Sequence, residues 1–262
     1  AKGAKVVYGQ RAANISDDMD VVVFTAAVHP DNPEFAEAKR RGIPMLSRAE
    51  LLGQMMRNYR QSLGVAGTHG KTTTTSMITE ILLAADADPT ISVGGILNSI
   101  GGNIRVGGSD LFVTEACEYT NSFLSFFPTM EIILNIEEDH LDFFKDLEDI
   151  RHSFRQFAMK LPEDGLLIIN SGIERLEELT DGLVCRVATF GNGPASDFRA
   201  ENVHHDQYAR AEFDVIRRGS RLCHIVLRVA GDHNVSNALA AIAACLDIEF
   251  QFEKKAEGLK HF

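Results

Sequence analysis

A glycine-containing segment between an apolar strand and a helix constrains this chain more than any other feature. Leu63 to Ala66 is a short apolar run typical of a buried strand. Gly67 and Gly70 follow in a turn where backbone N–H groups can converge on an anion without obstruction by a Cβ atom. A helix predicted to begin near Thr72 points its dipole and free N–H groups at that turn. The segment is therefore typical of a phosphate-binding loop.

The loop also carries the side chains that a nucleotide site needs. Lys71 supplies a positive charge for β- and γ-phosphates, and the hydroxyl of Thr72 is placed to bind Mg²⁺. The strict phosphate-loop pattern has a glycine five residues before Gly70, but this chain has Val65 there. Taken alone, Gly-Lys-Thr could therefore also be an ordinary turn that caps a helix. The predicted ATP-binding residues of the loop are Gly67, Thr68, His69, Gly70, Lys71, Thr72 and Thr73.

Composition excludes several classes of function. The net charge of −11 argues against nucleic acid or an anionic membrane as the main partner. No apolar run is long enough to span a membrane, and no signal peptide is recognisable. The four cysteines are far apart without a Cys-x-x-Cys pair, which argues against zinc or disulfide architecture and favours a reducing cytoplasm.

Alternating strand and helix patterns predict an α/β fold with two domains. Residues 1–61 read as a partial Rossmann-like domain, with strands over 5–7, 21–24 and 44–46 and helices over 33–41 and 48–60. Residues 62–262 read as a P-loop-type, parallel-sheet ATPase domain, with Gln61 and Ser62 as a short linker. An antiparallel hairpin over 211–216 and 221–229 extends it. No Gly-x-Gly-x-x-Gly occurs, so a nicotinamide or flavin site has no support.

Acidic residues and a histidine follow two predicted strands of the second domain. A strand over 111–114 delivers Glu115, and a strand over 131–135 is followed by three acids and His140. Because parallel strands place their carboxyl ends at one edge, Glu115 should face the nucleotide loop, where its oxygen atoms suit Mg²⁺. The alternative is a solvated loop, with an acidic first turn of the helix beginning near Leu147.

Three separated phrases resemble the signatures of one family. They are Gly-Thr-His-Gly-Lys-Thr-Thr-Thr at 67–74, Asn-Ile-Glu-Glu-Asp-His-Leu-Asp at 135–142 and Gly-Asp-His-Asn-Val-Ser-Asn-Ala at 231–238. In this order they resemble the Mur ligases, the ATP-dependent amide-forming enzymes of peptidoglycan precursor synthesis. The resemblance extends over nearly the whole chain.

The resemblance implies a role for each residue of the site. Lys71, Glu115 and His140 would be catalytic, with Thr72 and Glu115 at one Mg²⁺ ion and His140 at a second. A glycine-rich loop over 94–103 would lie along the pyrophosphate and sugar of the substrate. His233, Asn234 and Asn237 would contact adenine and ribose, although an asparagine there is equally suited to cap a helix. The implied substrate-binding residues are Asn32, His69, Glu118 and Ser122.

Within the family, the phrase Glu-Ala-Cys-Glu-Tyr-Thr at 115–120 is most similar to the members that join L-alanine to the lactyl carboxylate of UDP-N-acetylmuramate through an acyl phosphate. Members that recycle murein tripeptide onto the same UDP-sugar are the alternative, but Cys117 and Thr120 depart from their Glu-Ala-Asp-Glu-Tyr-Asp. Folylpolyglutamate synthase is a poorer match. A nucleotide-binding regulator without ligase activity and a non-catalytic paralogue are further alternatives; intact Lys71, Glu115 and His140 speak against the paralogue.

The resemblance also sets expectations for partners and for the ends of the chain. The implied partners are ATP, Mg²⁺, UDP-N-acetylmuramate and L-alanine, in a monomer or weak homodimer. The chain begins at Ala1 as if inside the first domain, and residues 257–262 read as the end of a helix before the family's third domain. We therefore expect these residues alone to bind nucleotide weakly and to ligate little or no alanine.

Overall fold

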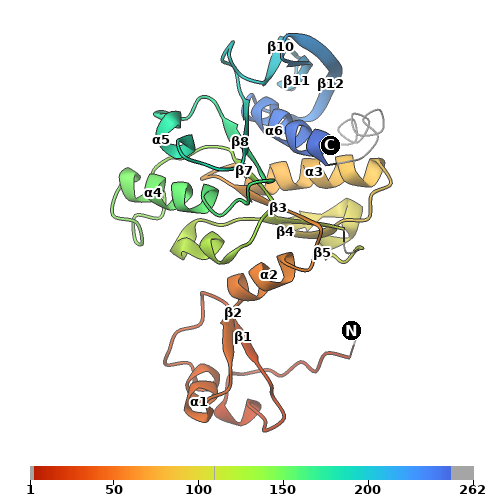
Figure 1. Cartoon of the computed structure of the whole chain (residues 1–262). Helices are drawn as coiled ribbons and strands as arrows, with labels where there is room; N and C mark the ends of the chain where they lie inside the picture. The colour runs from red at the N-terminus through yellow and green to blue at the C-terminus, as the bar shows by residue number, and fades with distance from the viewer. Residues whose placement is uncertain (1–2, 109, 249–262) are drawn as a thin grey trace.

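A small parallel sheet forms the N-terminal part of the molecule. The computed structural model describes residues 3–108 and 110–248. Strands β1 (Val22–Phe24) and β2 (Met45–Ser47) pair in parallel, and helix α1 (Pro33–Arg41) connects them. A short 3-10 helix, η1 (Ala12–Asn14), precedes them, and α2 (Arg48–Met56) leads to the larger part of the molecule (Figure 1).

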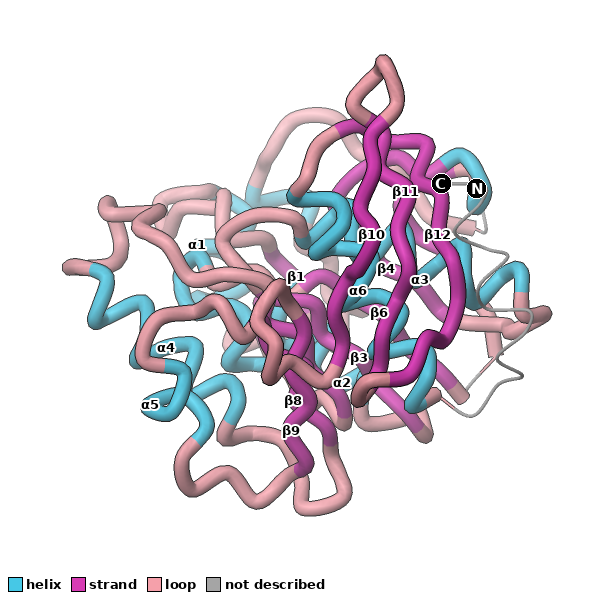
Figure 2. The backbone as a smooth tube through the Cα atoms, turned by 90° about the horizontal axis from the view of Figure 1, so that it is seen from above, coloured by secondary structure: helices cyan, strands magenta, loops and turns pink. Residues whose placement is uncertain are grey.

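The larger part is built on a ten-stranded sheet in the order β12-β11-β10-β9-β8-β7-β3-β6-β4-β5. The strands from β4 to β10 in this order pair in parallel, whereas β5 and the β10-β11-β12 extension are antiparallel. Strands β10, β11 and β12 lie side by side in Figure 2. The strands are β3 (Gln61–Ala66), β4 (Thr90–Leu97), β5 (Gly102–Arg105), β6 (Leu111–Glu115), β7 (Met130–Ile133), β8 (Leu166–Asn170), β9 (Arg186–Phe190), β10 (Phe198–His205), β11 (Arg210–Arg217) and β12 (Ser220–Ala230).

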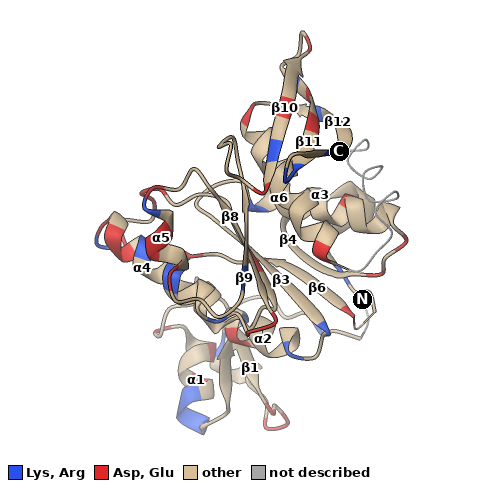
Figure 3. Cartoon of the chain, turned by 45° about the horizontal axis from the view of Figure 1, so that its top comes forward, with Lys and Arg blue, Asp and Glu red and all other residues tan. Residues whose placement is uncertain are grey.

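Helices cover both faces of this sheet, which explains why its central strands are mostly apolar and buried. Helices α3 (Lys71–Ala84) and α6 (His233–Asp247) pack with Val65 and Ile132 on one face. Helix α4 (Leu147–Ala158) packs with Ile133 and Leu167 on the other. The short elements α5 (Leu176–Thr180), η2 (Asn98–Ile100) and η3 (Tyr119–Ser125) complete the fold. Strands β3 and β8 are tan throughout in Figure 3, because they carry no charged residue.

Local capping sets the helices of the N-terminal part. The side chain of Asn32 accepts hydrogen bonds from the backbone N–H groups of Glu34 and Phe35, and Gly42 ends α1 with a left-handed φ of 68°. Ser47 and Glu50 form a capping box at the start of α2. None of the helices in the described residues is both long and apolar enough to cross a membrane.

The N-terminal part differs from the sequence prediction in three places. Residues 5–7 are exposed and form no strand. The described residues of the N-terminal part therefore contain two strands, β1 and β2, where the sequence predicted three. The second helix ends at Met56, because a turn follows it. Gln61 and Ser62, predicted as a linker, begin β3, where Gln61 donates its backbone N–H to the carbonyl of Asp110.

The predicted glycine-rich loop over residues 94–103 is also wrong. Most of it is regular structure: the end of β4, the turn η2 and the start of β5. Its glycines allow close packing, since a Cβ atom at Gly94 would lie 2.8 Å from the carboxylate of Glu115. The antiparallel extension has three strands where the sequence predicted two, because β10 also joins it. The helix predicted over residues 257–262 lies outside the described residues.

Candidate functional site

The glycine loop lies between β3 and α3 at the carboxyl edge of the sheet. Gly67 and Gly70 have φ angles of 141° and 87°, which L side chains rarely adopt. Gly70 is the N-cap of α3, and no side chain caps the helix. The N–H groups of the first turn therefore face the loop as an anion-binding helix terminus.

The segment after β7 holds this loop in place. The backbone N–H of Thr68 donates to the carbonyl of Asn135 at 3.2 Å. The Asn135 side chain accepts from the N–H of His69 at 2.8 Å and donates to its carbonyl at 3.1 Å. The buried Thr68 hydroxyl accepts from the N–H of Glu137 at 2.9 Å. Asn135 was not predicted as a site residue, although it opens the phrase that contains His140.

Lys71 folds back over the loop and pairs with Glu118. Its Nζ atom donates to the carbonyl oxygens of Gly67 and Thr68, at 2.5 and 3.1 Å, and lies 3.2 and 3.0 Å from the two carboxylate oxygens of Glu118. The lysine side chain is 16% exposed and the glutamate side chain 2% exposed. Sequence reasoning assigned Glu118 to substrate, whereas here it is the counter-ion of the loop lysine.

Glu115 and Thr72 form the second polar contact of the loop. The hydroxyl of Thr72 donates to the Glu115 carboxylate at 3.1 Å, and the other carboxylate oxygen accepts the backbone N–H of Gly94 at 2.5 Å. The hydroxyl and the carboxylate are oxygen ligands of the kind that Mg²⁺ takes. The predicted metal residues Thr72 and Glu115 are therefore together.

Replacing Gly94 with alanine tests whether this arrangement matters. The added Cβ would meet the flexible end of Glu115, so the carboxylate should move while the fold is retained. We expect metal-dependent nucleotide binding to weaken about tenfold, the usual cost of disturbing a group that orients a metal ligand. Isothermal titration calorimetry measures it. Gly102→Ala is the control because a Cβ there meets nothing within 4 Å, and equal affinities for the two variants would contradict this role of Gly94.

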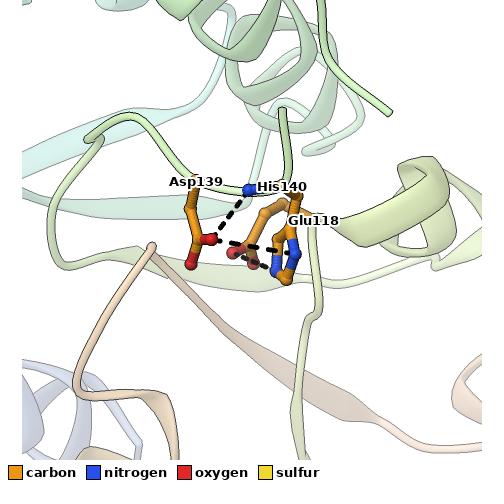
Figure 4. A group of neighbouring side chains, drawn as sticks. All are labelled: Glu118, Asp139 and His140. Carbon is orange, nitrogen blue, oxygen red and sulfur yellow. Dashed lines mark hydrogen bonds and ion pairs between the residues drawn. The ribbon is translucent and has the colours of Figure 1, made fainter. Parts of the chain in front are cut away.

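His140 belongs to a cluster with Glu118 and Asp139. One potential ligand atom from each residue lies within 4.8 Å of the others, and Figure 4 shows the three side chains converging. His140 has a left-handed φ of 52°, and its ring lies 4.6 Å from that of Tyr119. The Tyr119 hydroxyl donates to Asp142 at 2.9 Å. Two carboxylates and an imidazole suit a divalent cation, and sequence reasoning missed Asp139, the residue before His140.

The predicted metal ligands therefore lie around two consecutive loop residues. Glu115 contacts Thr72, whereas His140 lies 3.9 Å from Glu118, which pairs with Lys71. Glu115 and His140 therefore both lie at the carboxyl edge of the sheet, beside the loop. This agrees with their positions in the chain, because Glu115 ends β6 and His140 follows β7.

The predicted adenine-side residues lie at the start of α6. His233 is exposed, whereas the side chains of Asn234 and Asn237 are buried and bond within the protein. Asn234 donates to the carbonyl of Ala230, and Asn237 donates to Asn234. Neither asparagine caps the helix, because Asp232 occupies the N-cap position. A Cβ at Gly70 would lie 2.6 Å from the Asn237 side-chain oxygen, so Asn237 supports the back of the loop.

The remaining predicted residues have structural partners. Asn32 caps α1 and donates to Gln10, and the Ser122 hydroxyl donates to the carbonyl of Tyr119. The His69 side chain is exposed, 3.9 Å from Glu137. Thr73 is half-buried in the first turn of α3. Substrate binding by Asn32, His69 and Ser122 stays a prediction.

Two open cavities share Asn170, the last residue of β8, and the first of them also borders the segment that holds the loop. One, of about 630 Å³, lies between the ends of β7 and β8 and includes Asn135, Arg151 and Asn170. The other, of about 320 Å³, is bordered by Asn170, by residues after β9 and by Ser236 of α6. Asn170 lines both cavities and donates to the carbonyl of Leu134 at 3.0 Å.

An anion-binding loop before a helix, a loop lysine and carboxylates at neighbouring strand ends define a phosphate-loop nucleotide-binding protein of the α/β class. Residues 65–245 match the Mur ligase middle domain, and residues 1–60 match the Mur ligase family, catalytic domain. The chain belongs to the Mur ligase family.

Curated relatives share this region at high identity. UDP-N-acetylmuramate--L-alanine ligase of Lachnospira eligens is 58% identical over 261 residues, which is 99% of this chain and 57% of the relative. The enzyme of the same name from Clostridium kluyveri is 45% identical over 261 residues, again 57% of its length. The chain thus spans less than two thirds of the relatives it matches.

Solved structures share the fold. The UDP-N-acetylmuramate:L-alanyl-gamma-D-glutamyl-meso-diaminopimelate ligase of Neisseria meningitides superposes with a TM-score of 0.87 at 28% identity, over 97% of this chain and 82% of that one. The UDP-N-acetylmuramate-alanine ligase of Thermotoga maritima superposes with a TM-score of 0.82 at 30% identity, over 97% of this chain and 57% of that one.

Proposed function

We propose that the protein is an ATP-dependent ligase that joins L-alanine to the lactyl carboxylate of UDP-N-acetylmuramate. The observation that carries the proposal is the gathering of Lys71, Glu115, Glu118 and His140 around the N-terminus of α3. Such a site can hold the phosphates of ATP and offset their charge as a second anion, the carboxylate, approaches. The proposed reaction needs no covalent nucleophile from the protein, so positioning and electrostatics supply the catalysis.

In the proposed reaction, a carboxylate oxygen of the sugar substrate attacks the γ-phosphorus of ATP, and ADP leaves. The amine of L-alanine then attacks the acyl carbon, and phosphate leaves. Lys71 and the N–H groups at the start of α3 bind the phosphates. Thr72 and Glu115 would hold one Mg²⁺ ion, and His140 with Glu118 or Asp139 a second. The ions supply charge neutralisation.

In this proposal the base and ribose of ATP occupy the cavity bordered by Ser236, because Ser236 precedes Asn237, the residue of α6 that contacts Gly70 of the loop. The buried amides of Asn234 and Asn237 then act by fixing the helix and the loop. We also place the protein in the cytoplasm; its oligomeric state, expected to be a monomer or a weak dimer, stays a prediction.

Ligation of tripeptide in place of L-alanine is the second candidate. It is favoured by the TM-score of 0.87 with the Neisseria ligase. A shared fold does not define the substrate, however, and identity to that protein is 28% against 58% to the Lachnospira alanine ligase. The alanine reaction therefore has the stronger support.

Phosphate release tests the choice. Because these residues alone are expected to ligate little or no alanine, the test uses a protein that carries them within the length of the curated relatives, of which this chain covers 57%. That protein is given ATP, Mg²⁺ and UDP-N-acetylmuramate, with either L-alanine or L-alanyl-γ-D-glutamyl-meso-diaminopimelate as the amine. We expect phosphate release that depends on both UDP-N-acetylmuramate and L-alanine. Release with the tripeptide alone would favour the second candidate. ATP binding without release in either mixture would favour a non-ligase nucleotide-binding protein.

A further inference from the structure

The loop lysine is fully engaged within the protein. The three N–H groups of the Lys71 ammonium face three partners, namely the carbonyl oxygens of Gly67 and Thr68 and the carboxylate of Glu118. An ammonium group has only three donors. Lys71 can therefore reach a bound phosphate only by giving up bonds that it makes here.

Glu118 depends on this lysine. Its side chain is 2% exposed, and both carboxylate oxygens lie within 3.2 Å of Nζ of Lys71. The other basic group near it in the described residues is His140, whose Nε2 atom is 3.9 Å away. Asp139 completes the cluster with a second carboxylate (Figure 4). If Lys71 left and no other cation came, Glu118 would be a buried and uncompensated charge, which is strongly unfavourable.

A divalent cation can compensate that charge. Glu118, Asp139 and His140 already place one ligand atom each within 4.8 Å of the others, so a cation among them would contact the same carboxylate that Lys71 leaves. The movement of Lys71 to phosphate and the arrival of a cation at Glu118 are therefore favourable together and unfavourable separately.

We propose that Glu118 is a positioning residue that couples the two events: it holds Lys71 in the loop until a divalent cation replaces the lysine, and so makes nucleotide binding depend on that cation. This inference rests on the proposed nucleotide site. It gives Glu118, which the sequence prediction assigned to substrate binding, a role in controlling the loop lysine. Glu118 restrains the free site and then stabilises the filled one.

If a cation replaces Lys71 at Glu118, a neutral side chain at position 118 should strengthen nucleotide binding in the absence of a divalent cation, where a loss would otherwise be expected. In Glu118→Gln, Lys71 leaves no charge behind, so nucleotide should bind more tightly than in the unchanged protein when no divalent cation is present. With Mg²⁺ the advantage should vanish, because glutamine is a poorer ligand for the cation than carboxylate. A residue that only supported the fold would instead weaken binding under both conditions.

The experiment measures the dissociation constant of ADP by titration calorimetry for the full chain, in EDTA and in an excess of Mg²⁺, about 5 mM. The test quantity is the ratio of the constant in EDTA to that in Mg²⁺. We expect this ratio to fall at least about tenfold in Glu118→Gln, chiefly through tighter binding in EDTA. Glu118→Asp keeps the charge and should retain most of the ratio. Glu138→Gln makes the same charge change at an exposed position nearby and is the matched control.

The outcomes separate this inference from the proposed function. If the unchanged protein binds ADP and Glu118→Gln has the same ratio, or binds more weakly in EDTA, the coupling role is wrong while the nucleotide site stands. If Glu118→Asp loses the ratio as Glu118→Gln does, the charge is not the cause and the inference is again wrong. If the unchanged protein binds ADP under neither condition, the proposed nucleotide site itself fails. Thermal unfolding of each variant without ligand shows that the binding is compared between folded proteins.

Discussion

Replacing Lys71 with methionine should lower ATP-dependent turnover about 100- to 1,000-fold, the range seen when one preorganised charge contact to a transition state is lost. Methionine keeps the length of an unbranched side chain but removes the charge that faces the phosphates in the proposed reaction. Phosphate release at saturating substrate concentrations measures the effect, in a protein that carries these residues within the length of the curated relatives. Lys145→Met is the matched control, because Lys145 is 86% exposed and pairs only at 3.9 Å with Asp146. A turnover within threefold of the control would contradict a role for Lys71 in catalysis.

The same replacement should also destabilise the protein, since Glu118 loses its buried partner. Removing one member of a buried pair costs about 3–5 kcal/mol. The double variant with Glu118→Gln removes both charges, so it should recover most of the stability but none of the turnover. Urea unfolding of the two single variants and the double variant gives the coupling energy. Additive losses of stability would show that the Lys71–Glu118 contact is energetically unimportant.

The loop and the central strands were predictable because their signals are local. Leu63 to Ala66 is apolar on both faces, as a strand covered by helices must be, and it is buried between α3 and α4. The helix predicted over residues 33–41 is α1, which Gly42 ends with a left-handed φ of 68°. The division of the chain at residues 61 and 62 stays a prediction.

Side-chain partners across elements could not be predicted in the same way. Glu115 and Glu118 are three residues apart, yet Glu115 bonds to Thr72 and Gly94 whereas Glu118 turns inward to Lys71. Glu115 is the last residue of β6, whereas Glu118 lies beyond the strand as the N-cap of η3, so the alternation of a strand does not set the direction of its side chain. Strand β4 was missed because its two glycines read as a loop, although Gly94 allows close packing against Glu115 and Gly95 lies against Thr72.

Glu131 is a further feature that the sequence concealed. It lies in the middle of β7, between Leu63 to Ala66 of β3 and the apolar strand β8, and it is fully buried. Neither carboxylate oxygen has a hydrogen-bond partner. Burial raises the pKa of Glu131 well above its usual 4.5, and the charge of Lys160 lowers the pKa by less. The folded protein therefore favours the neutral acid.

The sign of the pH effect follows from this raised pKa. Below about pH 4.5 the carboxyl is protonated in both the folded and the unfolded chain, so it costs no stability through ionisation. As the pH rises above 4.5 the unfolded chain loses its proton while the folded chain retains it, and stability falls until the folded-state pKa is passed. Glu131 is thus destabilising at neutral and alkaline pH.

Replacing Glu131 with leucine should therefore stabilise the protein, and by more at pH 8 than at pH 5. Leucine suits the apolar face that Ile133 and Leu167 line, and it removes the cost of a buried polar group without a hydrogen-bond partner, about 1–3 kcal/mol. Urea unfolding at both pH values measures the gain relative to the unchanged protein. Glu163→Leu, at an exposed position, should give no pH-dependent gain. A gain of equal size at pH 5 and pH 8 would show that ionisation of Glu131 is not the cause, and a loss of stability at both would show that its carboxyl is satisfied within the core.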